Sequence, residues 1–100
     1  MPGLSINVPH ALDLPEVMRR LRDGCEAAKT AYQSHLSDFE EIWNPDSLCC
    51  RFRALGQKFQ GTLQAAQDEV RVQMDLPMMA MMFRGAIESK VSEELGKLLA

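Results

Sequence analysis

The sequence predicts one α+β domain in which an antiparallel sheet carries two helices packed on one face. Apolar residues recur at helical spacing in two segments, they alternate with polar residues in several others, and turn-forming residues separate the alternating segments. The chain has 100 residues, of which 46% are hydrophobic, which suffices for one core but not for two. We therefore predict a single domain over residues 1–100 in the order β-α-β-β-β-β-α.

The first strand and the first helix are predicted by the N-terminal third of the chain. Residues 4–8 alternate between apolar and polar side chains, and Pro9 ends that strand. Asp13 is a natural N-cap, and Pro15 is tolerated in the first turn of the helix that follows. An apolar stripe then runs to about Gln33 and consists of Leu14, Val17, Met18, Leu21, Cys25, Ala28 and Tyr32.

A change to a period of two predicts four further strands, which form a meander. Their expected ranges are residues 37–43, 48–55, 58–65 and 69–76. The connections are turn sequences, Asn44-Pro45-Asp46-Ser47, Gly56-Gln57 and Gln67-Asp68. Both faces of the first of these strands are mixed, which predicts a bulge or an edge position. Helical spacing returns in residues 85–99.

If a single layer of helices covers the sheet, one face of each helix and strand must be buried from solvent. We expect buried side chains at Ile6, Leu21, Cys25, Phe52, Leu63, Val72, Val91 and Leu95. The opposite face of the sheet should meet water, and it includes Arg51, Gln60 and Arg71.

Charge and hydropathy exclude several classes of function. The net charge is −3 and acidic residues interrupt every candidate basic stripe, so we expect no nucleic-acid partner. We expect no transmembrane segment, because no stretch approaches the roughly 20 apolar residues that cross a bilayer. The N-terminus also lacks the regions of a signal peptide, which predicts a cytoplasmic protein. A core this small would gain stability from a homodimer.

The residue types that most often carry chemistry form no recognisable catalytic or metal-binding pattern. His10 and His35 belong to no arrangement of nucleophile and base, and we interpret them as surface or loop residues. Cys49 and Cys50 are neighbours on a strand, so their side chains point to opposite faces and cannot chelate one ion. The three cysteines, with Cys25, indicate reduced thiols. We expect no catalytic residue, no metal and no cofactor.

The segment between the last strand and the last helix is apolar on every side. It contains Met78, Met79, Met81, Met82 and Phe83 directly after Pro77. One interpretation is that the segment crosses from the sheet to the helix and closes one end of the core, as apolar runs often do. The other is an exposed patch that binds an apolar surface or a partner, for which the flexible thioether of methionine is well suited.

Several short pieces of the chain, in their order and spacing, are similar to those of one known family. The pieces are Ile6-Asn7-Val8-Pro9-His10, Arg20-Leu21, Ser37-Asp38, Trp43, Phe52-Arg53-Ala54-Leu55-Gly56, Gly61-Thr62-Leu63, Asp75-Leu76-Pro77 and Phe83-Arg84-Gly85-Ala86-Ile87-Glu88. On these residues the chain resembles the polyhydroxyalkanoic acid system proteins, small bacterial proteins encoded near polyester-granule genes. The resemblance spans nearly the whole chain, and none of its pieces is a catalytic signature. This sequence departs from the family in its methionine density and in Cys49-Cys50.

The resemblance implies a part in polyhydroxyalkanoate storage, with the granule surface or a granule protein as the partner. Our first hypothesis is a non-enzymatic accessory or granule-associated protein that binds through the five apolar residues between Met78 and Phe83. The alternative is a small carrier of a lipid or another hydrophobic ligand, with a cavity between the sheet and the C-terminal helix near Tyr32, Trp43 and Phe83. An exposed methionine segment favours the first, and a segment buried around a void favours the second.

Overall fold

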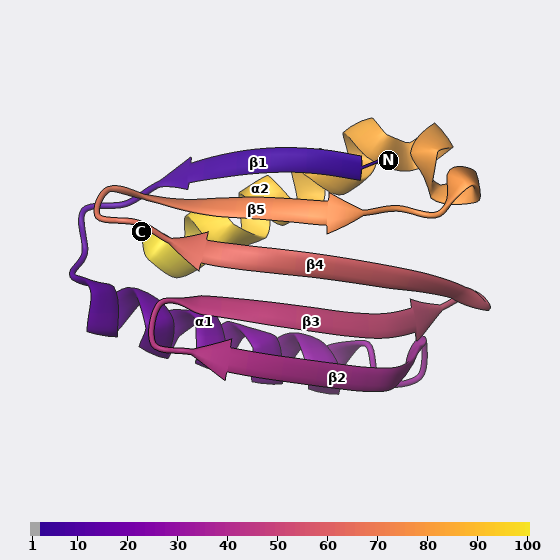
Figure 1. The fold of residues 1–100 in the computed structure, drawn as a ribbon, viewed down its shortest axis with the longest axis horizontal. Coiled ribbons are helices and arrows are strands. Elements are labelled where there is room, and N and C mark those ends of the chain that lie inside the picture. The colour runs from indigo at the N-terminus through magenta and orange to yellow at the C-terminus, as the bar shows by residue number, and fades with distance from the viewer. Residues whose placement is uncertain (1–2) are drawn as a thin grey trace.

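The computed structural model describes residues 3–100 and confirms the predicted α+β fold. Five antiparallel strands form one sheet in the order β1-β5-β4-β3-β2, and both helices lie behind it on the same face (Figure 1). The elements are β1 (Gly3–Pro9), α1 (Leu14–Ala31), β2 (Leu36–Asn44), β3 (Ser47–Ala54), β4 (Gln57–Ala65), β5 (Glu69–Asp75), the 3₁₀ helix η1 (Met78–Phe83) and α2 (Arg84–Leu99).

Helix α1 begins where the capping pattern predicts. The Asp13 carboxylate accepts a hydrogen bond of 2.9 Å from the amide of Glu16, which satisfies a free donor of the first turn. Further along α1, the Arg20 guanidinium donates to the carbonyl oxygens of Leu98 and Ala100 at 3.0 and 2.6 Å. A cation from α1 thereby caps the C-terminus of α2, where the helix dipole is negative.

The β3–β4 turn lies one residue earlier than predicted, at Leu55 and Gly56 and not at Gly56 and Gln57. Leu55 and Gly56 both have positive φ angles, 55° and 74°, so the β3–β4 hairpin closes with a mirror-image turn. In β2 the pairing register shifts between Ser37 and Glu40, and Asp38 takes a φ of 51°. The expected bulge and the expected edge position are therefore both present in β2.

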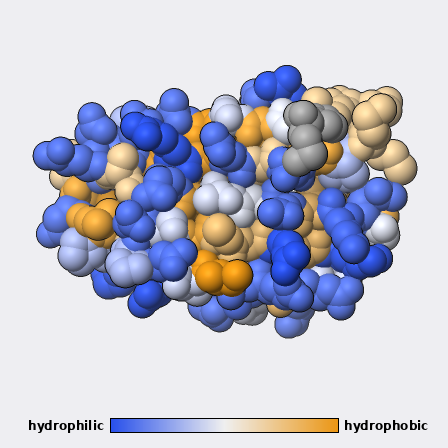
Figure 2. Space-filling model, viewed as in Figure 1, coloured by the Kyte–Doolittle hydropathy of each residue, from blue (hydrophilic) through white to orange (hydrophobic). Residues whose placement is uncertain are grey.

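The faces of the sheet have the predicted register, because Arg51, Gln60 and Arg71 are exposed on the face opposite the helices. Figure 2 shows that this open face is mainly hydrophilic. On the helix face the predicted core residues Leu21, Val72 and Leu95 are buried. The other five are only half-buried, since two helices do not cover five strands completely; they are Ile6, Cys25, Phe52, Leu63 and Val91.

The buried apolar residues divide into two clusters of unequal size. The large cluster lies between both helices and the sheet, and contains Val8, Val17, Met18, Leu21, Ala65, Val70, Val72, Leu95 and Leu99. The small cluster consists of Leu4, Leu76 and Ala80, at the end of the sheet where η1 begins. That end of the fold carries the methionine-rich segment 78–83, for which the sequence allowed two interpretations, core or exposed patch.

Candidate functional site

The methionine segment folds as the short 3₁₀ helix η1. Pro77 precedes it in an extended conformation, and the Ala80 amide donates to the Pro77 carbonyl at 2.9 Å. No side chain caps the N-terminus of this helix. A 3₁₀ helix has three residues per turn and occurs in short pieces. The six residues of η1 form such a piece between β5 and α2.

Most of the apolar side chains of η1 face solvent. Met78, Met79, Met82 and Phe83 are exposed to 80%, 67%, 84% and 62%, and we call these four residues the methionine patch. Ala80 is buried in the small cluster, and Met81 is half-buried against it. The structure therefore brings together four of the five predicted contact residues and turns Met81 inward.

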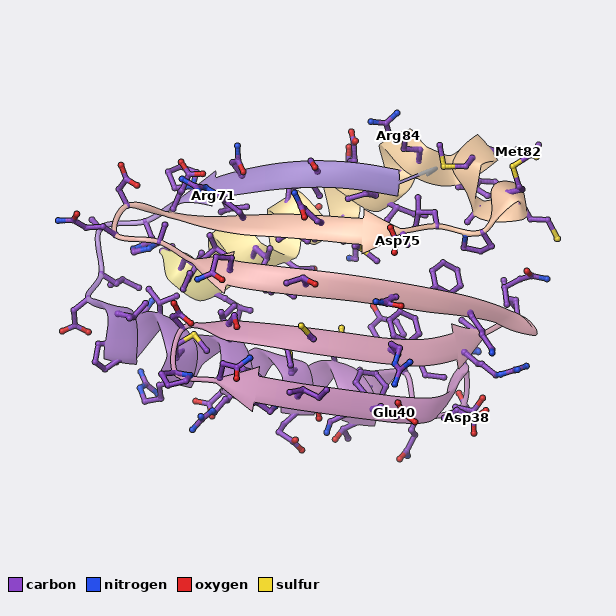
Figure 3. All side chains as sticks on the ribbon, in the orientation of Figure 1. Asp38, Glu40, Arg71, Asp75, Met82 and Arg84 are labelled. Carbon is purple, nitrogen blue, oxygen red and sulfur yellow. The ribbon has the colours of Figure 1, made fainter. Side chains whose placement is uncertain are left out.

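The methionine patch lies at one end of the molecule. Met82 points away from the sheet at the outer end of η1, and Arg84 projects outward beyond the edge of the sheet that β1 forms (Figure 3). Arg84 forms an ion pair with Glu88 at 3.3 Å, so the nearest cation along the chain is already paired. The patch thus offers an apolar surface without an unpaired charge in the segment itself.

Another exposed apolar side chain, Leu55, lies at the same end of the molecule as the methionine patch. Leu55 is 92% exposed at the tip of the β3–β4 turn, which projects to the right in Figure 1, as η1 does. Sequence reasoning placed Leu55 at the end of a strand, whereas its positive φ angle shows that it belongs to the turn. Large exposed apolar groups that gather on one part of a surface are typical of contact regions.

A shallow depression of about 810 Å³ extends across the sheet next to η1. Its charged side chains are largely paired: Arg51 with Glu40 at 2.7 Å and Arg53 with Asp38 at 3.4 Å. Three phenylalanines, Phe39, Phe52 and Phe59, are also among the residues around it and stack across β2, β3 and β4 with centroids 5.5 and 5.3 Å apart. Their rings lie on the helix face of the sheet, where Lys29 of α1 is 5.5 Å from the Phe39 ring centroid, and the paired charges lie on the opposite face. The bulge in β2 places Phe39 in this row, and the mixed faces of the strand predicted the bulge but not this position of Phe39.

His10 and the three cysteines are half-buried, and their surroundings affect how reactive they are. His10 is half-buried: its Nδ1 accepts from the Leu12 amide at 3.1 Å and its Nε2 lies 2.9 Å from the Ala66 carbonyl, so it ties two connections together. Burial raises the pKa of the Cys25 thiol to about 12 and raises the pKa of Cys50 as well. High pKa values disfavour the thiolate that reacts or binds metal. Residues 3–100 contain no group of three ligating side chains placed to hold a metal ion.

A carboxylate lies near these thiols beneath α1. Glu41 is an acceptor for the Lys29 ammonium at 2.6 Å, and Lys29 also contacts Glu26 at 2.9 Å. These hydrogen bonds raise the pKa of Lys29. The second carboxylate oxygen of Glu41 is buried without a hydrogen-bond partner. This group fixes the end of α1 to β2 and is an ionic contact within the fold.

The cavity of the alternative hypothesis does not form around the expected residues. Tyr32 and Phe83 are exposed, and Trp43 packs against the large cluster with the Arg22 guanidinium 5.4 Å from its ring centroid. Within the described part of the chain, no helix is long and apolar enough to cross a membrane.

Comparison with known proteins identifies one family. The profile of the polyhydroxyalkanoic acid system proteins (PHA_gran_rgn) matches residues 4–99. No curated protein and no solved structure matches the chain. The matched range runs from the second residue of β1 to the end of α2, with the methionine patch inside it.

Proposed function

The chain belongs to the polyhydroxyalkanoic acid system family, and from this premise we propose that it is a non-enzymatic accessory protein that attaches to storage granules through the methionine patch. The observation that carries the proposal is the exposure of Met78, Met79, Met82 and Phe83 on a connecting segment. The partner is the polyester surface or a protein on it, and the protein works in the bacterial cytoplasm at these granules.

The chemistry of the patch suits an irregular aliphatic surface. Methionine has three rotatable bonds and a polarizable thioether, so its side chain adapts to a partner that has no single shape. Burial of apolar area is favourable by about 25 cal/mol per Å². Burying half of the methionine patch would therefore contribute several kcal/mol to binding, before the cost of ordering the side chains is subtracted. That range fits reversible attachment. Met81 and Ala80 hold the segment to the small cluster, so the four exposed side chains are presented from a fixed base.

The carrier hypothesis has less support, because its expected cavity residues do not enclose a space. The depression beside η1 is open, and four of its six charged groups are paired with one another, Arg51 with Glu40 and Arg53 with Asp38. A carrier would need a ligand shielded from water on most sides. Binding of a soluble fatty acid by the purified chain, measured by calorimetry, would favour the carrier over surface attachment.

Co-sedimentation with polyhydroxyalkanoate particles tests the proposal directly. The wild-type chain should pellet with the particles, and a Met79→Ser, Met82→Ser variant should bind at least about tenfold more weakly, as expected from the loss of two large apolar contacts. Because both residues are exposed, the variant should melt within a few degrees of the wild type.

An Ile42→Ser variant is the matched control. Ile42 is also an exposed apolar residue, at 61%, but it lies on β2, away from η1. It should bind as the wild type does. Equal binding by a folded Met79→Ser, Met82→Ser variant would exclude the patch as the contact, and an unfolded variant would show instead that these methionines are core.

A further inference from the structure

We propose that the outer edge of β1 is a homodimer interface, at which two copies of the chain join their sheets in antiparallel pairing. The proposal does not rest on the methionine patch. In Figure 1, β1 is the last strand at one edge of the sheet, and among residues 3–100 no other element lies beyond it along most of its length.

The two edges of the sheet differ in how they are protected. β2 carries Asp38, Glu40 and Glu41 and is interrupted by a bulge. β1 (Gly3–Pro9) has no ionisable side chain and pairs with β5 in an unbroken register. Edge strands avoid pairing with other chains through charges and bulges. β2 has both of these features and β1 has neither, so β1 is the edge that is open to a partner strand.

The free backbone groups of β1 can be assigned from one hydrogen bond. The His10 amide donates to the Asp68 carbonyl at 2.9 Å, and these residues continue the register in which Pro9 lies opposite Glu69. Hydrogen-bonded and non-hydrogen-bonded pairs alternate along an antiparallel ladder. The amide and carbonyl groups of Gly3, Ser5 and Asn7 therefore point outward. Pro9 also points outward, which is where a residue without an amide belongs on an edge strand.

In one register a second copy of β1 satisfies all of these groups except the Gly3 carbonyl, which faces the nitrogen of Pro9. With the two-fold axis at Ile6, the whole strand pairs with itself: Ser5 lies opposite Asn7 of the second copy, and Gly3 lies opposite its Pro9. Each outward amide then meets a carbonyl. The facing side chains on the open side of the sheet are small and neutral, so no charge is buried or repelled.

The same register brings apolar side chains together on the helix face. Ile6 is half-buried and packs against both clusters, and at the two-fold axis it meets its own counterpart. In this two-fold symmetric pairing each β1 edge is occupied by the other, so no free β1 edge remains to extend the assembly into a filament. The paired β1 strands run in opposite directions, and η1 lies at the Gly3 end of β1 (Figure 1). The two η1 segments therefore lie at opposite strand ends of the ten-stranded sheet.

A pair of double variants tests both the interface and its register. Ser5→Glu with Asn7→Glu puts like charges opposite each other twice, and should weaken dimerisation by about tenfold or more. Ser5→Lys with Asn7→Glu puts opposite charges at the same positions, and should dimerise at least as well as the wild type. Both variants have the same change beside Arg71, so they differ only in the sign of the charge at position 5.

Sedimentation equilibrium of the full chain over a range of concentrations gives the dimer constants. The Met79→Ser, Met82→Ser variant should dimerise as the wild type does, which separates this interface from contacts through the patch. A wild-type chain that stays monomeric at high micromolar concentration would overturn the proposal. So would equal dimerisation by the two charge variants when circular dichroism shows both to be folded.

Discussion

The two apolar clusters of this protein use their hydrophobic residues in opposite ways. In the large cluster, residues at regular helical and strand spacing are buried between two helices and the sheet, and Leu21, at 1% exposure, is typical. In the small cluster, η1 buries Ala80 and exposes four larger side chains. The difference shows that an apolar run is buried only when its periodicity matches the surface on which it lies. A short 3₁₀ helix turns too tightly to place every residue of such a run against one surface.

The largest expected effect comes from truncation within the large cluster. Leu21→Ala should lower the free energy of unfolding by about 2–5 kcal/mol, because helices on one side and strands on the other prevent collapse around the cavity. Leu76→Ala in the small cluster should cost less, about 2 kcal/mol, since the flexible Met81 can move into the space. Urea denaturation of both variants measures the difference. A larger loss for Leu76→Ala would contradict the division into a strong and a weak cluster.

A moderate effect is expected where α1 crosses α2. A Cβ atom added at Gly24 would lie 2.5 Å from Cδ1 of Leu98, so Gly24→Ala forces that side chain to move. Overpacking lowers the free energy of unfolding by about 1–3 kcal/mol, and the better helix propensity of alanine raises it by up to about 1 kcal/mol. We expect a net loss of about 1 kcal/mol by thermal or urea unfolding.

Leu98→Ala supplies the control for this crossing. In the Gly24→Ala, Leu98→Ala double variant the clash is absent, so its loss should be smaller than the sum of the two single losses. Additive losses would show that the helices separate freely at this point.

The smallest effect concerns the ionic groups at the start of α1, and it depends on pH. Hydrogen bonds from Arg19 and Arg20 lower the pKa of Glu16 from 4.5 to about 2. A carboxylate whose pKa is lower in the folded state stabilises the fold above its unfolded pKa, and that stabilisation is lost as pH falls from about 4.5 to about 2. Melting temperatures of the wild type and Glu16→Gln should therefore differ more at pH 7 than at pH 2. A constant difference would mean that the contact makes no pH-dependent contribution.

Most of the secondary structure could be predicted from the sequence, because periodicity and turn residues act locally. The capping contact of Asp13, the strand faces and the hairpins all follow from residues close together in the chain. The bulge in β2 could be predicted as a disturbance of the alternation, but its position at Asp38 could not. For the candidate site, the sequence identified the methionine segment, and the structure was needed to separate the exposed residues from Met81.

The order of the elements and the two faces of the sheet follow from the amino-acid sequence alone, since the period of the side chains depends only on the local backbone. How completely each face is covered depends on the packing of the helices against the sheet. Ile6 and Phe52 have the right spacing for burial, yet they remain half-buried because the helices leave parts of the sheet uncovered. Tertiary packing also determines that η1 closes the small cluster with Ala80 and turns its methionines outward. Burial depends on what lies opposite a side chain, and residues distant in the sequence supply that surface.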